Sequence, residues 1–193
     1  MAGMERRRIA VFLPSLVGGG AERVMVTLVN AFVRRRFAVD LVLASLEGPY
    51  LTSVGSGVRV VDLKAGRVIK ALFPLIRYLR RERPVAMLSA MEHANVVAVM
   101  AAKLSRTSTR VVVSERTTVS GAYQNATGLS AKLTFRLMRS LYPNADGICS
   151  VSKAVALDLA EFVNLPSDKV EVIYIPFNLQ LIERKAVADC GHP

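Results

Sequence analysis

The sequence predicts an α/β fold: a Rossmann-like lobe with a mainly parallel sheet of about seven strands and helices on both faces. The first observation is that short apolar runs alternate along the chain with segments whose apolar residues recur at helical spacing. The second is that most of these runs are continuously apolar, as expected of parallel strands buried on both faces. The third is that 193 residues, 52% of them hydrophobic, suffice for one substantial core, and the length alone suggests one domain.

Seven runs are expected to be strands, and five periodic segments between them are expected to be helices. The strands are expected at 9–13, 37–44, 58–61, 85–88, 110–114, 147–151 and 170–175. The helices are expected at 21–35, 67–83, 95–104, 130–141 and 153–162. Ser152 is a suitable N-cap for the last helix, and Pro74 should kink the second helix or begin its second part. The polar segment 117–128 is expected to be a mobile loop.

The net charge of +11 is concentrated in the first half of the chain. Residues 1–83 hold 15 Lys and Arg against 6 Asp and Glu, whereas residues 84–193 hold 11 against 9. A basic surface attracts polyanions or anionic lipid headgroups. No helix-turn-helix signal, zinc-finger spacing or aromatic-rich strand accompanies the charge, so we predict no nucleic-acid partner.

The cysteines and the N-terminus bear on metals and on the compartment. Cys149 and Cys190 form no metal-ligand cluster, so no metal is predicted, and Cys149 is expected to be a small buried side chain. Residues 4–13 imitate a signal peptide, but the apolar stretch stops at Pro14 and three glycines. No uncharged apolar run reaches ~18 residues, the length of a spanning helix. We therefore expect a cytoplasmic protein in a reducing compartment.

Ligands of such sheets bind beyond the carboxyl ends of the strands, near the point where the strand order reverses. This rule selects the segments 14–22, 45–49, 62–64, 89–95, 114–118, 150–153 and 176–178. In the first segment three glycines, 18–20, join a strand to a helix, where exposed N–H groups and the positive end of the helix dipole favour phosphate or another anion. The alternative is a flexible turn without a ligand.

The glycine segment does not match the common nucleotide-binding fingerprints. In G-x-G-x-x-G the third glycine would fall on Arg23, and the acidic residue expected after the second strand is missing, because Asp40 lies near that strand's start. No Gly-Lys-Ser/Thr follows, which excludes a P-loop. A redox enzyme or an ATPase is therefore disfavoured.

Four segments together resemble the N-terminal domain of family-4 glycosyltransferases, which have the GT-B fold. The first is 16–23, Leu-Val-Gly-Gly-Gly-Ala-Glu-Arg, with its following helix. The second is 89–95 before an Ala-rich helix, and the third is 113–117, Val-Ser-Glu-Arg-Thr. The fourth is 145–152, which leads to 168–174. The resemblance covers nearly the whole chain.

The resemblance implies a two-lobed, sugar-nucleotide-dependent enzyme whose donor and acceptor meet in a cleft between the lobes. The N-terminal lobe typically holds the acceptor and lends its glycine loop to the donor. The residues carried over by position are Gly18, Gly19 and Gly20 in the donor loop, and Glu22, Arg23, Glu115, Arg116 and Thr117 beside the cleft. Among them, Arg116 suits an acceptor phosphate.

Two residues after the fourth predicted strand have two interpretations each. His93, the candidate catalytic residue, would hydrogen-bond a sugar hydroxyl near the reacting centre, as the resemblance implies, or would be a surface or capping residue. Asn95 would do similar work or would cap the next helix. Both alternatives stay open at this point.

The resemblance also implies the reaction type and the partners. Members of the family are mostly retaining hexosyltransferases that need no metal or cofactor, because positive groups stabilise the leaving nucleoside diphosphate. The implied partners are a nucleotide sugar and a glycan or lipid-linked acceptor, as in the synthesis of cell-envelope polysaccharide.

By the same resemblance, residues 1–178 correspond to the N-terminal domain, and residues 179–193 are expected to begin the interdomain connector or to form a tail. The donor domain is absent from this sequence, so little or no transferase activity is expected of it alone. The sequence departs from the family at Ile175, where members commonly have Asn before the proline.

The predicted helix 67–83 carries a basic stripe. A basic amphipathic helix can rest on an anionic bilayer, which suggests a peripheral protein on the inner membrane face. The alternative is a surface helix whose arginines are solvated. The residues concerned are Arg67, Lys70, Arg77, Arg80, Arg81 and Arg83.

Two other classes of function stay open. One is a non-catalytic Rossmann-like module that binds an acceptor or a partner protein. The other is a nicotinamide- or nucleotide-dependent α/β protein, which would need the acidic residue that is missing after the second strand. Sugar epimerases with the same two-lobed fold are a variant of the transferase interpretation.

Overall fold

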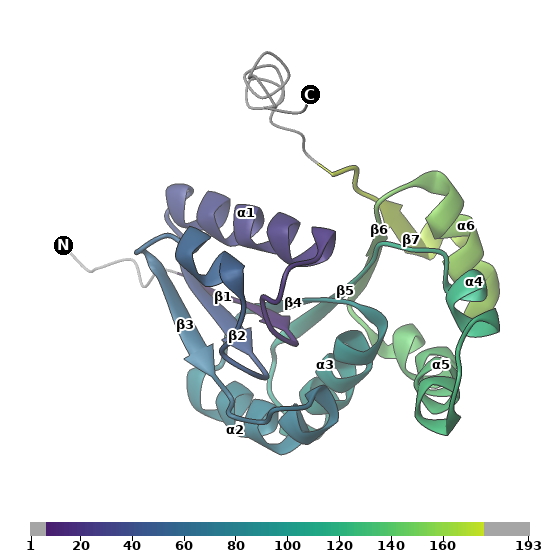
Figure 1. Cartoon of the computed structure of the whole chain (residues 1–193), viewed down its shortest axis with the longest axis horizontal. Coiled ribbons are helices and arrows are strands. Elements are labelled where there is room, and N and C mark those ends of the chain that lie inside the picture. Colours follow the sequence, from purple (N-terminus) through teal and green to yellow (C-terminus); the bar gives the residue numbers. More distant parts are fainter. Residues whose placement is uncertain (1–6, 176–193) are drawn as a thin grey trace, which may run out of the picture.

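A computed structural model describes residues 7–175 of the protein. Seven strands form one sheet in the order β3-β2-β1-β4-β5-β6-β7, and every neighbouring pair is parallel (Figure 1). The strand order reverses between β1 and β4, which places a crevice at the carboxyl ends of these two strands. The predicted Rossmann-like α/β class is confirmed. The strands are β1 (Arg8–Leu13), β2 (Ala38–Leu43), β3 (Val58–Asp62), β4 (Ala86–Ala90), β5 (Arg110–Glu115), β6 (Gly147–Ser150) and β7 (Val170–Val172).

The helices lie on both faces of the sheet, but unequally. The α-helices are α1 (Gly20–Arg34), α2 (Leu72–Glu82), α3 (Glu92–Ser105), α4 (Val119–Gln124), α5 (Leu129–Leu141) and α6 (Lys153–Phe162). Short 3₁₀ helices are η1 (Pro49–Ser53), η2 (Val68–Ala71), η3 (Tyr142–Asn144) and η4 (Ser167–Lys169). Within residues 7–175, α1 is the one α-helix that packs on its face of the sheet, while α2, α3, α5 and α6 share the core of the other face (Figure 1).

The two cores follow from the alternation of side chains along the strands. In β1, Val11 and Leu13 point toward α1, where they meet Met25 and Val29, whereas Phe12 points into the larger core. All five side chains are almost completely buried. Apolar residues on both sides of one strand explain why the strand runs appear continuously apolar in the sequence.

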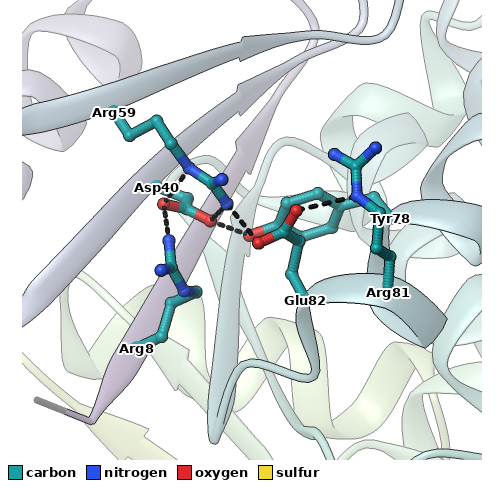
Figure 2. A network of polar contacts seen from close by, with 6 residues as sticks. All are labelled: Arg8, Asp40, Arg59, Tyr78, Arg81 and Glu82. Atoms are coloured by element: carbon teal, nitrogen blue, oxygen red, sulfur yellow. Dashed lines mark hydrogen bonds and ion pairs between the residues drawn. The ribbon is translucent and has the colours of Figure 1, made fainter. Parts of the chain in front are cut away.

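One acidic side chain interrupts this apolar pattern, in the amino-terminal half of β2. The Asp40 carboxylate is fully buried and accepts hydrogen bonds from Arg8 Nη1 at 2.7 Å, Arg59 Nε at 2.9 Å and the Tyr78 hydroxyl at 2.6 Å (Figure 2). Arg59 Nη2 also donates to Glu82 at 2.7 Å. Burial raises the pKa of Tyr78 well above its ordinary value, and the hydrogen bond to Asp40 adds to this. Because all these groups pair with one another, this network is structural.

Several predicted boundaries hold and others are corrected. The Ser152 hydroxyl accepts a hydrogen bond from Val155 N at 3.2 Å, which confirms the N-cap. Pro74 lies in the first turn of α2, after the 3₁₀ segment η2, so it marks the second part of the helical region. The Cys149 side chain is buried as predicted.

Three expectations were wrong. The segment 117–128 is not a loop throughout, because it contains α4. α3 begins at Glu92, three residues before its predicted start, and β7 ends at Val172 rather than at residue 175.

Residues 1–6 and 176–193, with the expected connector and Cys190, lie outside the described residues. Among residues 7–175, no helix combines the length and the apolarity that crossing a membrane requires.

Candidate functional site

The predicted site residues come together at one end of the sheet. Gly18, Gly19 and Gly20 follow β1, His93 and Asn95 follow β4, and Glu115, Arg116 and Thr117 end or follow β5. Because β1, β4 and β5 are consecutive neighbours in a parallel sheet, these three segments share one rim. This is the rim at which the strand order reverses, where ligands of open α/β sheets bind.

The glycine loop is anchored on one side and open on the other. Leu16 is fully buried, and its backbone N–H donates to the Glu47 carbonyl at 2.8 Å. Gly48 has a φ of 118°, and a Cβ there would collide with the Leu16 backbone. By contrast, a Cβ on Gly20 would meet nothing within 4 Å. The start of the loop is therefore held by the segment at residues 47 and 48, and the backbone at Gly20 is accessible to a ligand.

The N-terminus of α1 already holds a negative charge. Gly19 is the N-cap of α1 and has no side chain that could cap the helix. Glu22, in the first turn, is only 7% exposed, and its carboxylate occupies the position that a Cβ on Gly19 would need. A carboxylate is stabilised at a helix N-terminus by the positive end of the dipole. The expected phosphate therefore meets an internal anion at this helix start, and Glu22 is better suited to accept a hydrogen bond from a hydroxyl.

His93 lies in the first turn of α3 and is exposed at a groove of about 310 Å³. Partial burial lowers the pKa of His93, and the nearby Glu92 opposes this. The groove is lined by Glu92, His93, Ser130, Ala131, Thr134 and Phe135, so α5 forms its second wall. The helix N-cap at this place is Met91, which has a φ of 78°. His93 is therefore not a cap, and its ring is available to a ligand.

Asn95 and Glu115 do not reach the surface. Glu115 is 1% exposed, and its Oε1 accepts hydrogen bonds from Asn95 Nδ2 at 2.9 Å and from the Tyr142 hydroxyl. Asn95 Nδ2 also donates to the Ser114 carbonyl at 3.1 Å. Asn95 therefore does not cap α3, and Glu115 does not line the cleft with its side chain. They fix the start of α3 against the end of β5.

Burial governs the protonation of this cluster. The pKa of Glu115 is raised to about 8, chiefly by removal from water and secondly by the negative charge of Glu92, while the hydrogen bonds from Tyr142 and Asn95 work in the opposite direction. Burial also raises the pKa of Tyr142 well above its ordinary value. Near neutral pH the Glu115 carboxyl is mostly protonated, which avoids an isolated negative charge in the core.

Arg116 is a charged residue of the rim with two buried nitrogens that are unpartnered among the described residues. Its Nε and Nη1 atoms are buried, and neither makes a hydrogen bond within residues 7–175. Burial lowers the pKa of Arg116, and nearby Cys149, Glu115 and Glu22 oppose this. Glu22, in the first turn of α1, thus favours the charged form of Arg116, but the two side chains form no ion pair in the described part of the chain.

Arg23 and Thr117 contribute exposed polar groups to the rim. Both side chains are exposed, and the Thr117 hydroxyl donates to Glu92 Oε1 at 3.5 Å, a long contact. Within residues 7–175, no group of three or more His, Cys, Asp or Glu side chains is placed to hold a metal ion.

Unpartnered buried atoms mark this rim. Among the described residues, five buried side-chain nitrogen and oxygen atoms lack a hydrogen-bond partner. All of them belong to residues at or beyond the carboxyl ends of β1, β4 and β5. They are Glu22 Oε2, Ser89 Oγ, Asn95 Oδ1, Arg116 Nε and Arg116 Nη1. Buried polar groups are normally paired, so these atoms single out this rim as the candidate site. Ser89 and Asn95 are completely buried, so Glu22 and Arg116 are the members of the set that lie nearer the surface of the rim.

Sequence reasoning missed two residues of the site. Tyr142 comes from η3, and its hydroxyl reaches Glu115; nothing in the local sequence signals this contact. Asp158 on α6 holds the start of α4, and its signal is a lone acid in the apolar run 155–160. Both contacts join segments that are far apart in the chain.

The comparisons with known proteins identify relatives of about twice this length. A sequence model of the family described as Glycosyltransferase Family 4 matches residues 18–181. A Campylobacter jejuni protein is 29% identical over 194 residues, which are 95% of this chain and 52% of the relative. It is N-acetylgalactosamine-N,N'-diacetylbacillosaminyl-diphospho-undecaprenol 4-alpha-N-acetylgalactosaminyltransferase. The chain therefore spans about half the length of this curated relative.

Solved structures agree on the fold. Anabaena HepE in complex with UDP has a TM-score of 0.67 at 16% identity, covering 90% of this chain and 45% of HepE. Sucrose-phosphate synthase from Thermosynechococcus elongatus has a TM-score of 0.69 at 15% identity, covering 97% of this chain and 54% of that one. At these identities the likeness shows the fold alone. Again the chain matches about half of each structure.

Proposed function

Because this chain belongs to Glycosyltransferase Family 4, we propose that it is the acceptor-side lobe of an enzyme that transfers a sugar from a nucleotide sugar to a glycan or lipid-linked acceptor. The observation that carries the proposal is the set of unpartnered buried polar atoms on the rim beyond β1, β4 and β5. HepE is solved with UDP and with UDP-glucose, which supports a nucleotide sugar as donor. In the complete enzyme, a second lobe would close over this rim.

In the proposed reaction one glycosidic bond replaces another. The bond between the sugar C1 and the diphosphate breaks, and the nucleoside diphosphate leaves with the electron pair. The oxygen of the acceptor hydroxyl forms a new bond to C1, and its proton passes to the departing diphosphate. We propose that the configuration at C1 is retained and that positive side chains, not a metal or cofactor, stabilise the leaving group.

Each rim residue has a proposed role that its surroundings support. Gly20 lets the donor approach the backbone, because no described atom lies within 4 Å of the place a Cβ would take. Glu22 accepts a hydrogen bond from an acceptor or sugar hydroxyl. Arg116 binds a phosphate group of the acceptor, since its buried guanidinium lacks an anionic partner. His93 hydrogen-bonds a hydroxyl of the reacting sugar from the groove against α5.

We further propose a lipid-linked acceptor. The C. jejuni relative is named for an undecaprenol diphosphate acceptor. On α5, the helix that forms the wall of the His93 groove, Leu129 is 88% exposed and Leu133 is 55% exposed. Exposed apolar side chains on the helix that lines the groove fit an amphiphile whose sugar enters the groove and whose lipid stays outside.

A peripheral position on an anionic membrane is the corresponding proposal for location. Phe73 is 75% exposed on α2, near the exposed Leu104 of α3, and both line one hollow with Arg80, Lys103 and Arg106. Of the basic stripe, Arg80 donates to the carbonyls of residues 104 and 105, and Arg81 donates to Glu82. Arg67, Lys70 and Arg77 are exposed. Co-sedimentation with anionic vesicles but not with neutral vesicles is expected, and equal or absent binding contradicts the membrane proposal.

The transferase proposal is tested by supplying the other lobe. The 193-residue chain is assayed alone and fused to the C-terminal half of the C. jejuni relative, with UDP-N-acetylgalactosamine and a short-chain polyprenyl diphosphate-linked N-acetylgalactosamine. We expect UDP release from the fusion and little or none from the chain alone. A fusion that binds the acceptor without releasing UDP would favour the alternative, a non-catalytic acceptor- or partner-binding module. A fusion that binds no acceptor would contradict both the transferase proposal and the acceptor-binding form of the alternative.

A further inference from the structure

A carboxylate on α6 holds the segment that follows Arg116. Asp158 accepts hydrogen bonds from the backbone N–H of Val119 at 2.5 Å, from the backbone N–H of Ser120 at 3.2 Å and from the Ser120 hydroxyl. These two amides are the first of α4, and the helix's own N-cap, Thr118, makes no side-chain cap hydrogen bond. Asp158 therefore supplies from another helix the cap that α4 lacks.

The other end of α4 is also attached. Tyr123 makes edge-to-face contacts with Phe135 of α5 and Phe162 of α6, each with ring centroids 5.6 Å apart. Such aromatic contacts contribute beyond their buried area. The six residues of α4 are too few for a stable isolated helix, so these long-range contacts hold it in place.

Arg116 and Thr117 bridge two fixed points. Before them, Glu115 is fixed by Asn95 and Tyr142. After them, α4 is fixed by Asp158. No hydrogen bond of the Arg116 Nε or Nη1 atom holds the guanidinium within the described residues. The position of this guanidinium therefore depends on how the backbone is anchored on each side of it.

We propose that Asp158 is a positioning residue: by holding α4, it sets the place of the Arg116 guanidinium on the rim. This deepens the proposed function, on which it rests in one respect, namely that Arg116 binds a phosphate group. Asp158 itself stays on α6, where its carboxylate is already engaged by α4. Its effect on pyrophosphate binding should therefore pass through the segment that carries Arg116 and not through a direct contact between Asp158 and the ligand.

Variants of Asp158 separate charge from shape. Asp158→Ala removes all three hydrogen bonds. Asp158→Asn keeps the size and one accepting oxygen, so it remains informative if the alanine variant does not fold. The matched control is Glu161→Gln, which removes one negative charge from an exposed side chain of the same helix. Arg116→Ala, alone and combined with Asp158→Ala, tests whether the two residues act together.

The experiment uses NMR on the 193-residue chain. Hydrogen exchange is followed at the Val119 and Ser120 amides and at the Arg116 Nε–H, and inorganic pyrophosphate is titrated as the probe. In Asp158→Ala we expect exchange at all three groups to become at least about tenfold faster and the pyrophosphate Kd to weaken about fivefold. Asp158→Asn should be intermediate, Glu161→Gln unchanged, and the double variant no weaker than Arg116→Ala.

Two results would overturn the proposal. One is faster exchange at Val119 and Ser120 with an unchanged Arg116 Nε–H, which would make Asp158 only a helix cap. The other is additive loss of pyrophosphate affinity in the double variant. A wild-type chain in which pyrophosphate does not shift the Arg116 signal would contradict the phosphate role in the proposed function. In that case the Arg116 exchange rate in Asp158→Ala still decides the positioning role.

Discussion

The buried charged groups at the two ends of the sheet differ in whether they have hydrogen-bond partners. Toward the amino end, the Asp40 carboxylate receives hydrogen bonds from Arg8, Arg59 and Tyr78 (Figure 2). At the carboxyl end, Arg116 has two buried nitrogens without a partner, and Glu22 has one such oxygen. Both regions belong to the same seven-stranded sheet.

The comparison separates a structural role from a functional one. A buried polar group costs free energy unless it is paired, so selection for stability alone favours the complete network around Asp40. The unpaired groups at the other end reduce stability, and in the proposed function a ligand would pair with them. The sequence places acidic and basic residues at both ends, and only their partners distinguish the two roles.

Removing the charge at the centre of the complete network should have the largest effect. Asp40→Ala leaves Arg8 and Arg59 without their shared anion and Tyr78 without its acceptor, so we expect a loss of about 3 kcal/mol in the free energy of unfolding. Urea unfolding measures it, with the exposed Glu161→Gln as the control. A loss below about 1 kcal/mol would contradict the structural role of the network.

Removing the unpartnered charge at the carboxyl end should instead leave stability intact and reduce activity. Arg116→Ala deletes a buried cation without a partner, so the free energy of unfolding should stay unchanged or rise slightly. In the fusion with a donor lobe, UDP release should fall about 100-fold, or about 2.7 kcal/mol in transition-state stabilisation. Coupled UDP assays and urea unfolding are compared. Strong destabilisation with little loss of activity would reverse the assignment of the two ends.

Glu115 should make stability depend on pH. Its pKa is about 8 in the folded protein and about 4.5 when unfolded, so between these values the folded state binds more protons. Stability from this group is fully present below pH 4.5 and is lost as the pH rises through about 8, at up to about 1.4 kcal/mol per pH unit. Glu115→Gln should flatten this slope in urea unfolding from pH 5 to 8. An equally steep slope in the variant would argue against a buried proton on Glu115.

The smallest expected effect concerns the glycine loop. Gly20→Ala adds a methyl group where no described atom lies within 4 Å, so unfolding should change by less than about 0.5 kcal/mol. Donor affinity of the fusion, measured with UDP-N-acetylgalactosamine, should nevertheless weaken a few-fold if the donor approaches this backbone. Unchanged affinity would remove Gly20 from the donor loop.

Patterns within short segments predicted most of the fold. Short runs, most of them continuously apolar, located the seven strands, and the Ser152 cap and Pro74 marked real boundaries. The helix α4 could not be predicted, because its capping carboxylate, Asp158, comes from a different helix. The role of Asp40 could not be predicted for the same reason, because its partner Tyr78 comes from a distant helix. In the sequence Asp40 is only an interruption of an apolar strand.

The sequence predicted that the candidate site residues share one rim, but not the direction of every side chain. The rule for parallel sheets brought Gly19, His93 and Arg116 to the same end. It could not say that Asn95 and Glu115 turn inward, because the contact that buries them is made by Tyr142 from a later segment. It also could not show that the Glu22 carboxylate occupies the start of α1. Motif position gives the neighbourhood of a side chain, while long-range packing decides its direction.

One measurement tests most directly whether unpartnered buried groups mark the ligand site. In an NMR titration of the fusion with a short-chain polyprenyl diphosphate-linked N-acetylgalactosamine, the Nε–H signals of Arg116 and Arg59 report on the two ends of the sheet. We predict that the Arg116 signal shifts with the acceptor and that the Arg59 signal, already paired with Asp40, does not. A shift at Arg59 with a silent Arg116 would contradict the account.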